Sequence, residues 1–267
     1  MNILLIIIFF IIGLIFSSIF NNIWYRLPIK RNLYEKSTCD ICNHELKFNE
    51  KIPIISYIKQ KGKCNYCHEK ISVMYILFEL LMGILFSITY IKYKEISTEY
   101  FNIILSLVFI SSLLIIMFSD IKYMIIPDEL IITSSILIII YKLIDGFYTN
   151  ELNGFLDAGY MIIFMIMDAF IMFIIMYIIK KVGDMIFKKE SLGGGDIKMM
   201  AFISIIMGYK MSIIVIFLGS FIALPFSIYN AYKKNEAMLP FGPFLAISTI
   251  ILFLCNINFD MVLDFIH

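Results

Sequence analysis

The 267-residue chain is 61% hydrophobic and only 16% charged, so it lacks the polar residues that would cover a soluble globule. Its formal net charge of +1 gives no reason to expect nucleic-acid binding or a strongly acidic partner. We therefore expect an all-α polytopic membrane protein whose main partner is the lipid bilayer.

Apolar runs of about 20 residues match a hydrocarbon core about 30 Å thick. They predict a bundle of about eight transmembrane helices at residues 3–24, 73–91, 100–119, 126–144, 157–179, 197–208, 211–230 and 241–258. The sixth is short, which fits a tilted or half-buried helix. The first run has basic residues only after it, the wrong order for a cleaved signal peptide.

This pattern divides the chain into a first transmembrane helix (residues 1–24), a small polar module (25–72) and a helical bundle (73–267). The polar module carries ten basic residues near membrane ends, which indicates a cytoplasmic location. They are Arg26, Lys30, Arg31, Lys36, Lys47, Lys51, Lys59, Lys61, Lys63 and Lys70. Threading the remaining spans from there places the basic residues Lys180, Lys181, Lys188, Lys189, Lys233 and Lys234 inside as well.

The polar module contains two Cys-x-x-Cys pairs, Cys39/Cys42 and Cys64/Cys67. Four thiolates from two tight turns suit a closed tetrahedral zinc site. Disulfides, free thiols and c-type haem attachment at Cys64-Asn65-Tyr66-Cys67-His68 are the alternatives, and haem would require an outside location. His44 and His68 are alternative ligands. We expect the metal to be structural, because four protein ligands leave no open position for water.

Three glycines precede one aspartate in Gly193-Gly194-Gly195-Asp196, and Asp120 stands at the end of another apolar run. The glycines allow left-handed backbone and the close approach of another segment, such as an extended substrate. A helix N-cap is the simpler explanation for Asp196. The predicted topology nevertheless places both acids at cytoplasmic helix ends, whereas Asp128 follows Pro127 in an ordinary helix start.

Two carboxylates held within about 3 to 6 Å do not both ionise easily, so one becomes a base and the other an acid. Such a pair can activate water against an amide carbonyl while protonating its oxygen. Asp168, near the middle of a predicted span, is more consistent with a buried structural role, and Glu79 has interfacial snorkelling as its simpler explanation.

The chain also resembles the type IV prepilin peptidases, membrane aspartyl peptidases of the Gly-x-Gly-Asp group. The resemblance covers nearly the whole chain and rests on five stretches, namely Gly193 to Ala201, Asp120 to Asp128, Phe20 to Pro28, the four-cysteine loop with Pro53 to Tyr57, and Pro240 to Phe244. One departure is Ile76, where the family usually has proline, three residues before the retained Glu79.

The resemblance implies Asp120 and Asp196 as catalysts, supported by Gly193, Gly195 and Lys198. It also implies a bifunctional enzyme of the bacterial inner membrane, with its active site on the cytoplasmic face, that cleaves prepilin or pilin-like leaders and then methylates the new N-terminus from S-adenosylmethionine. For the methyltransferase site it points to Asn21, Arg26 and Glu79, but no glycine-rich fingerprint identifies the cofactor site. A homodimer is left open.

Two other classes of protein fit parts of the sequence. Intramembrane acids Asp120, Asp168 and Asp196 would suit a proton- or cation-coupled transporter, although the glycine run lies at a membrane edge rather than at the midplane. A zinc-dependent membrane scaffold without catalysis would need the cysteines but not the aspartates. Both fit fewer of the motifs than a peptidase does.

Overall fold

The computed structural model describes residues 3–39, 41–93, 100–149, 151, 154–188, 190–233 and 239–266. Lys189 and Lys234, two of the basic residues expected on the cytoplasmic side, lie outside these ranges. Contacts divide the chain into two compact units: unit 1 comprises residues 1–99 and unit 2 comprises residues 100–267.

The described secondary structure is helical apart from two isolated bridges, Thr38 with Glu45 and Lys63 with Lys70. Unit 1 contains α1 (Ile3–Arg26), a 3-10 turn (Phe48–Glu50), α2 (Ile55–Lys59) and α3 (Val73–Tyr93). Unit 2 contains α4 (Tyr100–Tyr123), α5 (Asp128–Tyr148), α6 (Phe155–Phe187), α7 (Gly194–Tyr232), α8 (Gly242–Leu254) and α9 (Phe259–Ile266). Among the described residues, six helices are long and apolar enough to cross a membrane, and α8 is a shorter apolar helix. The expected all-α multi-pass fold is confirmed.

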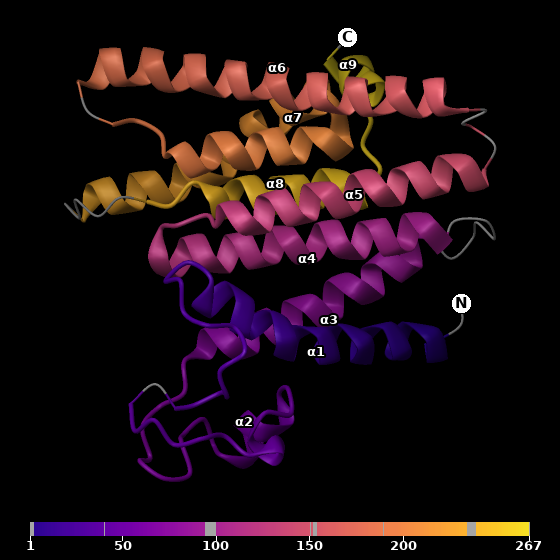
Figure 1. Ribbon diagram of the computed structural model, residues 1–267. Helices are drawn as coiled ribbons and strands as arrows, with labels where there is room; N and C mark the ends of the chain where they lie inside the picture. The colour runs from indigo at the N-terminus through magenta and orange to yellow at the C-terminus, as the bar shows by residue number, and fades with distance from the viewer. Residues whose placement is uncertain are drawn as a thin grey trace. The chain divides into compact units, whose positions relative to one another are not determined.

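In unit 1, α1 and α3 lie side by side (Figure 1). Their backbones meet at two glycines: a Cβ added at Gly13 would lie 2.8 Å from the Cα of Gly83. Small residues at a helix crossing let membrane helices gain van der Waals contact that bulkier residues would prevent. Nearby, Ser87 Oγ donates to the carbonyl oxygen of Ile6 across the helix pair at 3.1 Å. The missing side chains at Gly13 and Gly83 therefore set how closely α1 and α3 approach.

In unit 2, α4 is the central helix and most of its length is buried. Both α5 and α8 pack on α4, and α7 packs on α6 and α8 (Figure 1). Buried hydroxyls join these helices, as Ser112 Oγ donates to Ser134 Oγ at 2.7 Å and Ser248 Oγ donates to the carbonyl of Val215 at 3.1 Å. α6 is mostly exposed and apolar, as expected for a helix that faces lipid.

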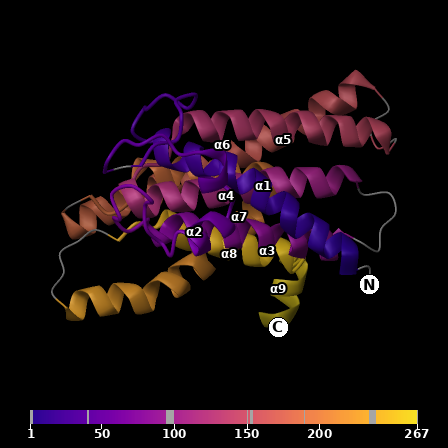
Figure 2. The same ribbon diagram turned by 90° about the horizontal axis from the view of Figure 1, so that it is seen from below.

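The two spans predicted at 197–208 and 211–230 are the arms of α7, which is broken at Gly208 (φ 76°, ψ 159°). The two arms run in different directions in Figure 2. A carboxylate oxygen of Asp168 lies 3.7 Å from the position of a Cβ on Gly208. Because the break frees backbone N–H groups at the start of the second arm, an acid beside it has a structural explanation. Counted as two arms, α7 brings the apolar segments to the expected number of about eight.

Replacing Gly13 by alanine is expected to separate α1 from α3 and to destabilise unit 1 by about 1–3 kcal/mol, because backbone atoms of Met82 and Gly83 already lie at 2.8 Å from the added carbon. Thermal unfolding of the purified protein in detergent measures the effect. Gly159→Ala is the matched control, since no atom lies within 4 Å of its added carbon. An unchanged midpoint for Gly13→Ala would contradict the close crossing.

Candidate active site

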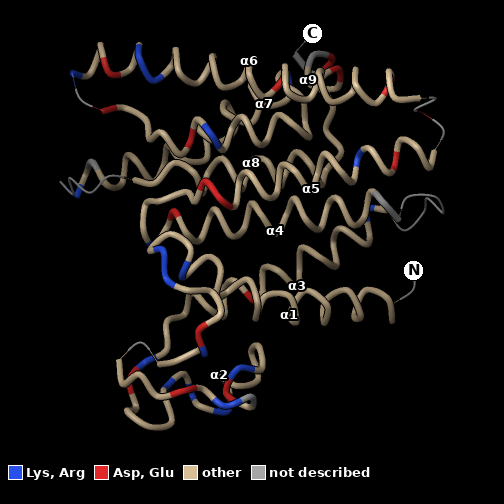
Figure 3. The backbone as a smooth tube through the Cα atoms, in the orientation of Figure 1, with Lys and Arg blue, Asp and Glu red and all other residues tan. Residues whose placement is uncertain are grey.

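Two acidic residues occupy adjoining helix ends in unit 2. Asp120 lies in the last turn of α4 and is 6% exposed, and Asp196 lies in the first turn of α7 and is 7% exposed. Their carboxylates are close enough to interact electrostatically. Charged residues gather at this end of the unit, where α4 and α6 end and α5 and α7 begin (Figure 3). Burial of two interacting acids beside a polar rim is typical of a catalytic site.

The N-terminus of α8 supports Asp120. The backbone N–H of Gly242, the first residue of α8, donates to Asp120 Oδ2 at 3.1 Å. Gly242 has no room for a side chain, because an added Cβ would lie 2.6 Å from the same oxygen. The N-terminal end of a helix favours a neighbouring negative charge through its free N–H groups and its dipole. Gly242 is therefore a site residue to which sequence reasoning assigned no role, although the Gly-Pro pair marks a helix start.

Ile126 fills the space between the two acidic helix ends. Its side chain is 3.1 Å from the position of a Cβ on Gly195 and 3.4 Å from that on Gly242. The loop that carries Ile126 turns back over Asp120 through Met124, whose φ is 53° and whose N–H bonds to the Asp120 carbonyl. Gly195 thus serves close packing against Ile126.

Left-handed backbone was one of the two expectations for the glycine run, and it is wrong: among the described glycines only Gly62 and Gly208 have positive φ. Gly193 lies against Asp196, whose Oδ2 is 3.2 Å from the position of an added Cβ, and Gly194 has no atom within 4 Å of that position. Gly193 and Gly194 are exposed. The run therefore leaves open space on one side of Asp196.

An ion pair joins the two aspartate motifs. Lys198 Nζ is 2.7 Å from both carboxylate oxygens of Asp128. Asp128 is the first residue of α5, and Lys198 lies about one turn into α7. Both side chains are about half exposed, so the pair contributes about 0–1 kcal/mol to stability. Because the pair joins α7 to α5, it helps to align the starts of these two helices. α5 begins at Asp128, with Pro127 in the preceding N-cap position.

The segment before the glycines is fastened to the end of α6. Ser191 donates to Asp184 Oδ1 through both its N–H and its hydroxyl, at 2.6 and 2.8 Å, and its hydroxyl is 2.5 Å from the position of a Cβ on Gly183. Lys180 pairs with Glu190 at 2.7 Å and also interacts electrostatically with Asp196. These contacts fix the chain's entry into the glycine run, and the sequence alone did not indicate them.

A candidate metal centre lies in unit 1. The sulfur atoms of the four cysteines all lie within 4.8 Å of one another, with Cys39 and Cys67 at 3.8 Å and Cys42 and Cys64 at 4.0 Å. A tetrahedral zinc–thiolate centre with bonds of about 2.3 Å requires sulfurs about 3.8 Å apart. The cluster consists of the four cysteines; neither His44 nor His68 contributes to it. The described residues therefore fit a four-thiolate zinc site.

The two Cys-x-x-Cys turns have the same backbone geometry. The N–H of Cys39 bonds to the carbonyl of His44 and that of Cys64 bonds to the carbonyl of Glu69, both at 2.9 Å. Asn43 and His68, which follow the second cysteine of each turn, have φ of 54° and 58°. Backbone N–H groups of Cys67 and Tyr66 lower the pKa of Cys64, and such donors stabilise the thiolate that a metal needs.

Glu79 lies in the first half of α3 and is only 8% exposed. Its Oε1 accepts from Asn21 Nδ2 at 3.0 Å, and its Oε2 accepts from the N–H of Ile54 at 2.8 Å. Asn21 in turn accepts from Trp24 Nε1 at 2.8 Å. Glu79 therefore does not snorkel to solvent; it joins α1, α3 and the cysteine loop.

Ile54, which donates to Glu79, has a strained backbone. Its φ of 60° and ψ of −50°, together with the bond from the Ile55 N–H to the Pro53 carbonyl, define a γ-turn of the rare positive-φ kind. A β-branched residue in this conformation costs about 1–3 kcal/mol and persists only where its surroundings enforce it. The bond to Glu79 is the visible constraint, and such strain concentrates at binding and catalytic sites.

Arg26, the last residue of α1, is 4% exposed and ties the loop to the helix. Its guanidinium donates to the carbonyl oxygens of Asn32, Leu33, Glu35 and Lys36 at 2.6–3.3 Å. A planar fork of donors suits this task, which lysine could not perform. Arg26 therefore stands beside Asn21 and Glu79 in unit 1 but uses its donors on the protein's own backbone.

Comparison with known proteins identifies relatives along almost the whole chain. Residues 11–93 match the bacterial peptidase A24 N-terminal domain, and residues 107–228 match the type IV leader peptidase family. A prepilin leader peptidase/N-methyltransferase of Bacillus subtilis is 31% identical over 265 residues, covering 97% of this chain and 96% of the relative. The enzyme of that name from Vibrio cholerae is 29% identical over 259 residues, covering 92% and 95%.

Comparison with solved structures found no match. The resemblance inferred from the motifs is confirmed by the matched regions, which include the cysteine module, both aspartates and Glu79. Because the chain aligns with the Bacillus subtilis enzyme over almost its whole length at 31% identity, it belongs to the type IV leader peptidase family.

Proposed function

We propose that this protein removes the leader peptide of type IV prepilins or pilin-like proteins at the cytoplasmic face of the bacterial inner membrane and then methylates the new N-terminus. The observation that carries the peptidase half is the pair of buried, interacting acids at adjoining helix ends, Asp120 and Asp196. Lys180, which interacts electrostatically with Asp196, and Lys198, which pairs with Asp128, are basic residues near the acids; together with the basic polar module they favour the cytoplasmic face.

In the proposed cleavage, Asp120 is the ionised member of the pair, because the Gly242 N–H donates to its carboxylate. Asp120 takes a proton from a water molecule as the water oxygen attacks the scissile carbonyl carbon. Asp196, protonated, donates its proton to the carbonyl oxygen. Collapse of the tetrahedral intermediate then breaks the C–N bond: one hydroxyl of the intermediate returns its proton to Asp196, and the leaving amine takes the proton held by Asp120. The exposed Gly193 and Gly194 leave room for the substrate backbone beside Asp196.

The second reaction needs a methyl donor, which S-adenosylmethionine supplies as an electrophilic methyl on a sulfonium sulfur: the amine lone pair forms the N–C bond while the C–S electron pair stays on sulfur. The substrate amine exists only after cleavage, so the order of the two reactions follows from their chemistry. We assign the second reaction to unit 1. Its candidate residues are Asn21 of α1 and Glu79 of α3, and the cysteine cluster would hold a zinc ion. The ion would hold the loop together, because the four thiolates leave it no open position.

Asp120→Asn and Asp196→Asn are each expected to lower the cleavage rate at least about a hundredfold, because the amide keeps the shape of the carboxyl group but does not exchange a proton. Mass spectrometry of a purified prepilin, sampled over time with the enzyme in detergent, measures leader loss. Asp168→Asn is the matched control on α6. Cleavage at the normal rate by either active-site variant would remove it from the catalytic pair.

Gly242→Ala is expected to slow cleavage by about 10- to 100-fold while the protein still folds. The added methyl group would lie 2.6 Å from Asp120 Oδ2 and would displace the carboxylate from its hydrogen bond with the Gly242 N–H. Hydrogen bonds to charged groups contribute about 1.5–3 kcal/mol. The same cleavage assay, compared with Gly159→Ala, measures the effect. An unchanged rate would show that the α8 N-terminus does not support catalysis.

Removing the metal, by chelation or by Cys64→Ser, is expected to abolish methyl transfer and leave leader cleavage in place, because the aspartates belong to the other compact unit. Metal content by elemental analysis should fall from one zinc per chain to none in the same samples. Cys255→Ser, outside the cluster, is the control. Loss of cleavage with the bundle still folded would contradict a purely local role for the metal.

A further inference from the structure

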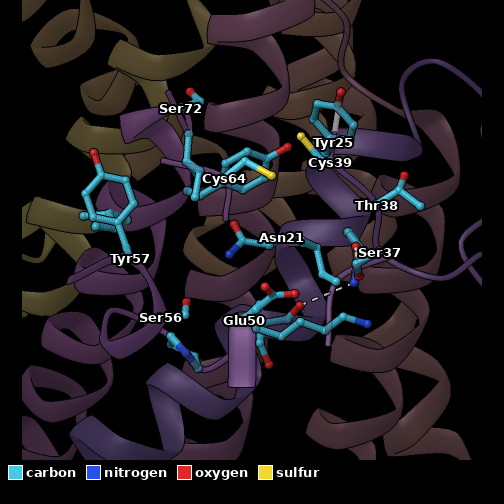
Figure 4. A pocket seen from close by; sticks show the side chains of 18 of the residues that line it. Asn21, Tyr25, Ser37, Thr38, Cys39, Glu50, Ser56, Tyr57, Cys64 and Ser72 are labelled. Carbon is cyan, nitrogen blue, oxygen red and sulfur yellow. Dashed lines mark hydrogen bonds between the residues drawn. The ribbon is translucent and has the colours of Figure 1, made fainter. Parts of the chain in front are cut away.

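The two faces of α2 have different surroundings. On one face, Ser56 and Tyr57 line a cavity of about 730 Å³ that lies between α1, α3 and the cysteine loop. Figure 4 shows these two side chains on one side of the cavity and Asn21 nearer its middle. On the opposite face, Ile55 and Ile58 are three residues apart and are 50% and 66% exposed. α2 therefore turns polar and aromatic groups inward and presents two aliphatic side chains outward.

Lysines surround this outward face. Four of them are exposed in the last turn of α2 and in the chain that follows it, namely Lys59, Lys61, Lys63 and Lys70. Together with Ile55 and Ile58 they form what we call the basic patch. None of the four lysines forms an ion pair with another residue that the structure describes. Residues 51–70 contain five lysines and one glutamate, which gives a formal charge of +4 (5 − 1), and Figure 3 shows blue segments beside α2.

Two lysines of the basic patch face each other across a backbone bridge. Lys63 and Lys70 are partners in an isolated antiparallel bridge. The Cβ atoms of such partners lie about 4.5–5.5 Å apart, and like charges directly opposite each other destabilise the pairing. Glu69, the one acid of the segment, is exposed and forms no ion pair with a described residue. An anion bound beside Lys63 and Lys70 would offset their repulsion.

Contacts with the membrane helices hold the basic patch beside the bilayer. Glu79 lies six residues after Val73, the first residue of α3, which is about 9 Å along the helix. Glu79 accepts a hydrogen bond from the N–H of Ile54, and α2 begins at the next residue. Ile15, in the second half of α1, lines the same cavity as Ser56. The loop is therefore folded back along α1 and α3, and α2 lies beside these helices rather than beyond their ends.

We propose that the basic patch docks on the anionic lipid head groups of the leaflet that it faces. Exposed aliphatic side chains next to lysines match such a surface, because the aliphatic groups enter the boundary between head groups and acyl chains while the ammonium groups bind lipid phosphates. Ile55 and Ile58 supply the aliphatic part, and phosphates supply the anions that Lys63 and Lys70 lack. This membrane association is additional to the two proposed reactions and does not depend on either of them.

Hydrogen exchange of the full-length protein in lipid nanodiscs tests the docking. The amides of residues 55–63 are expected to exchange at least about tenfold more slowly in nanodiscs that contain phosphatidylglycerol than in neutral phosphatidylcholine nanodiscs. Salt at about 1 M, where the Debye length is about 3 Å, should remove the difference between the two lipids. Equal exchange in both lipids at low salt would overturn the proposal, and this comparison needs no variant.

A lysine variant identifies the charges that are responsible. The triple variant Lys59→Gln/Lys61→Gln/Lys63→Gln is expected to lose most of the dependence on lipid charge. Lys36→Gln/Lys47→Gln changes two exposed lysines of the same loop outside the basic patch and should keep that dependence. A triple variant with the full tenfold difference would remove these lysines from the lipid contact.

The aliphatic side chains and the alternative occupant are tested in the same assay. Ile58→Asn is expected to speed exchange of residues 55–63 at least about threefold in both lipids, whereas Tyr34→Asn, at a 96% exposed position outside the basic patch, should not. An unchanged rate for Ile58→Asn would contradict insertion of α2. Slow exchange that appears only when a prepilin is added, and equally in both lipids, would assign the basic patch to the substrate and overturn lipid docking.

Discussion

The peptidase half of the molecule depends on the close approach of helix ends around one buried carboxylate. Asp120 is reached by the N-terminus of α8 only because Gly242 has no side chain, and α7 comes beside the same loop only because Gly195 has none. Ile126 packs between them. In a membrane bundle, where an ionisable group is costly, these contacts both shield Asp120 and supply it with a backbone donor. Gly195 and Gly242, which have no side chains, thus allow the helix ends to bring the two acids close together.

Unit 1 also buries a carboxylate, but different groups surround it. Its buried carboxylate, Glu79, also accepts from a backbone N–H, but the donor lies in a strained turn and not at a helix start. Asp120 interacts with a second acid, whereas Glu79 has an amide neighbour, Asn21, and a cavity. A paired acid suits proton transfer within a hydrolytic reaction. The two buried carboxylates therefore differ in their neighbours, which are a second acid for Asp120 and an amide and a cavity for Glu79.

Much of this arrangement could be predicted from the sequence. Hydropathy identifies the spans, and the spacing of Cys39, Cys42, Cys64 and Cys67 identifies the cluster, because both signals are local in the chain. Contacts between distant segments could not be predicted in the same way. Nothing in the sequence places the Gly242 N–H on Asp120, Ile54 on Glu79 or Lys198 on Asp128, since each depends on how helices pack. The break at Gly208 divides one helix into the two predicted spans. The position of an acid at residue 168 is explained only by its closeness to that break.

The cysteine loop shows why a cavity persists where close packing is the rule. Between residues 27 and 72 the only described buried residues are Pro28, Gly62 and Cys64, so this segment has no hydrophobic core of its own. Segments of this size without a core usually need a metal or another cross-link. Here Arg26 binds four carbonyl groups at one end, the thiolate cluster closes the other, and Glu79 holds the turn between them. Because these polar contacts and the cysteine cluster act at the margins of the loop, its interior is left without close packing and contains the cavity.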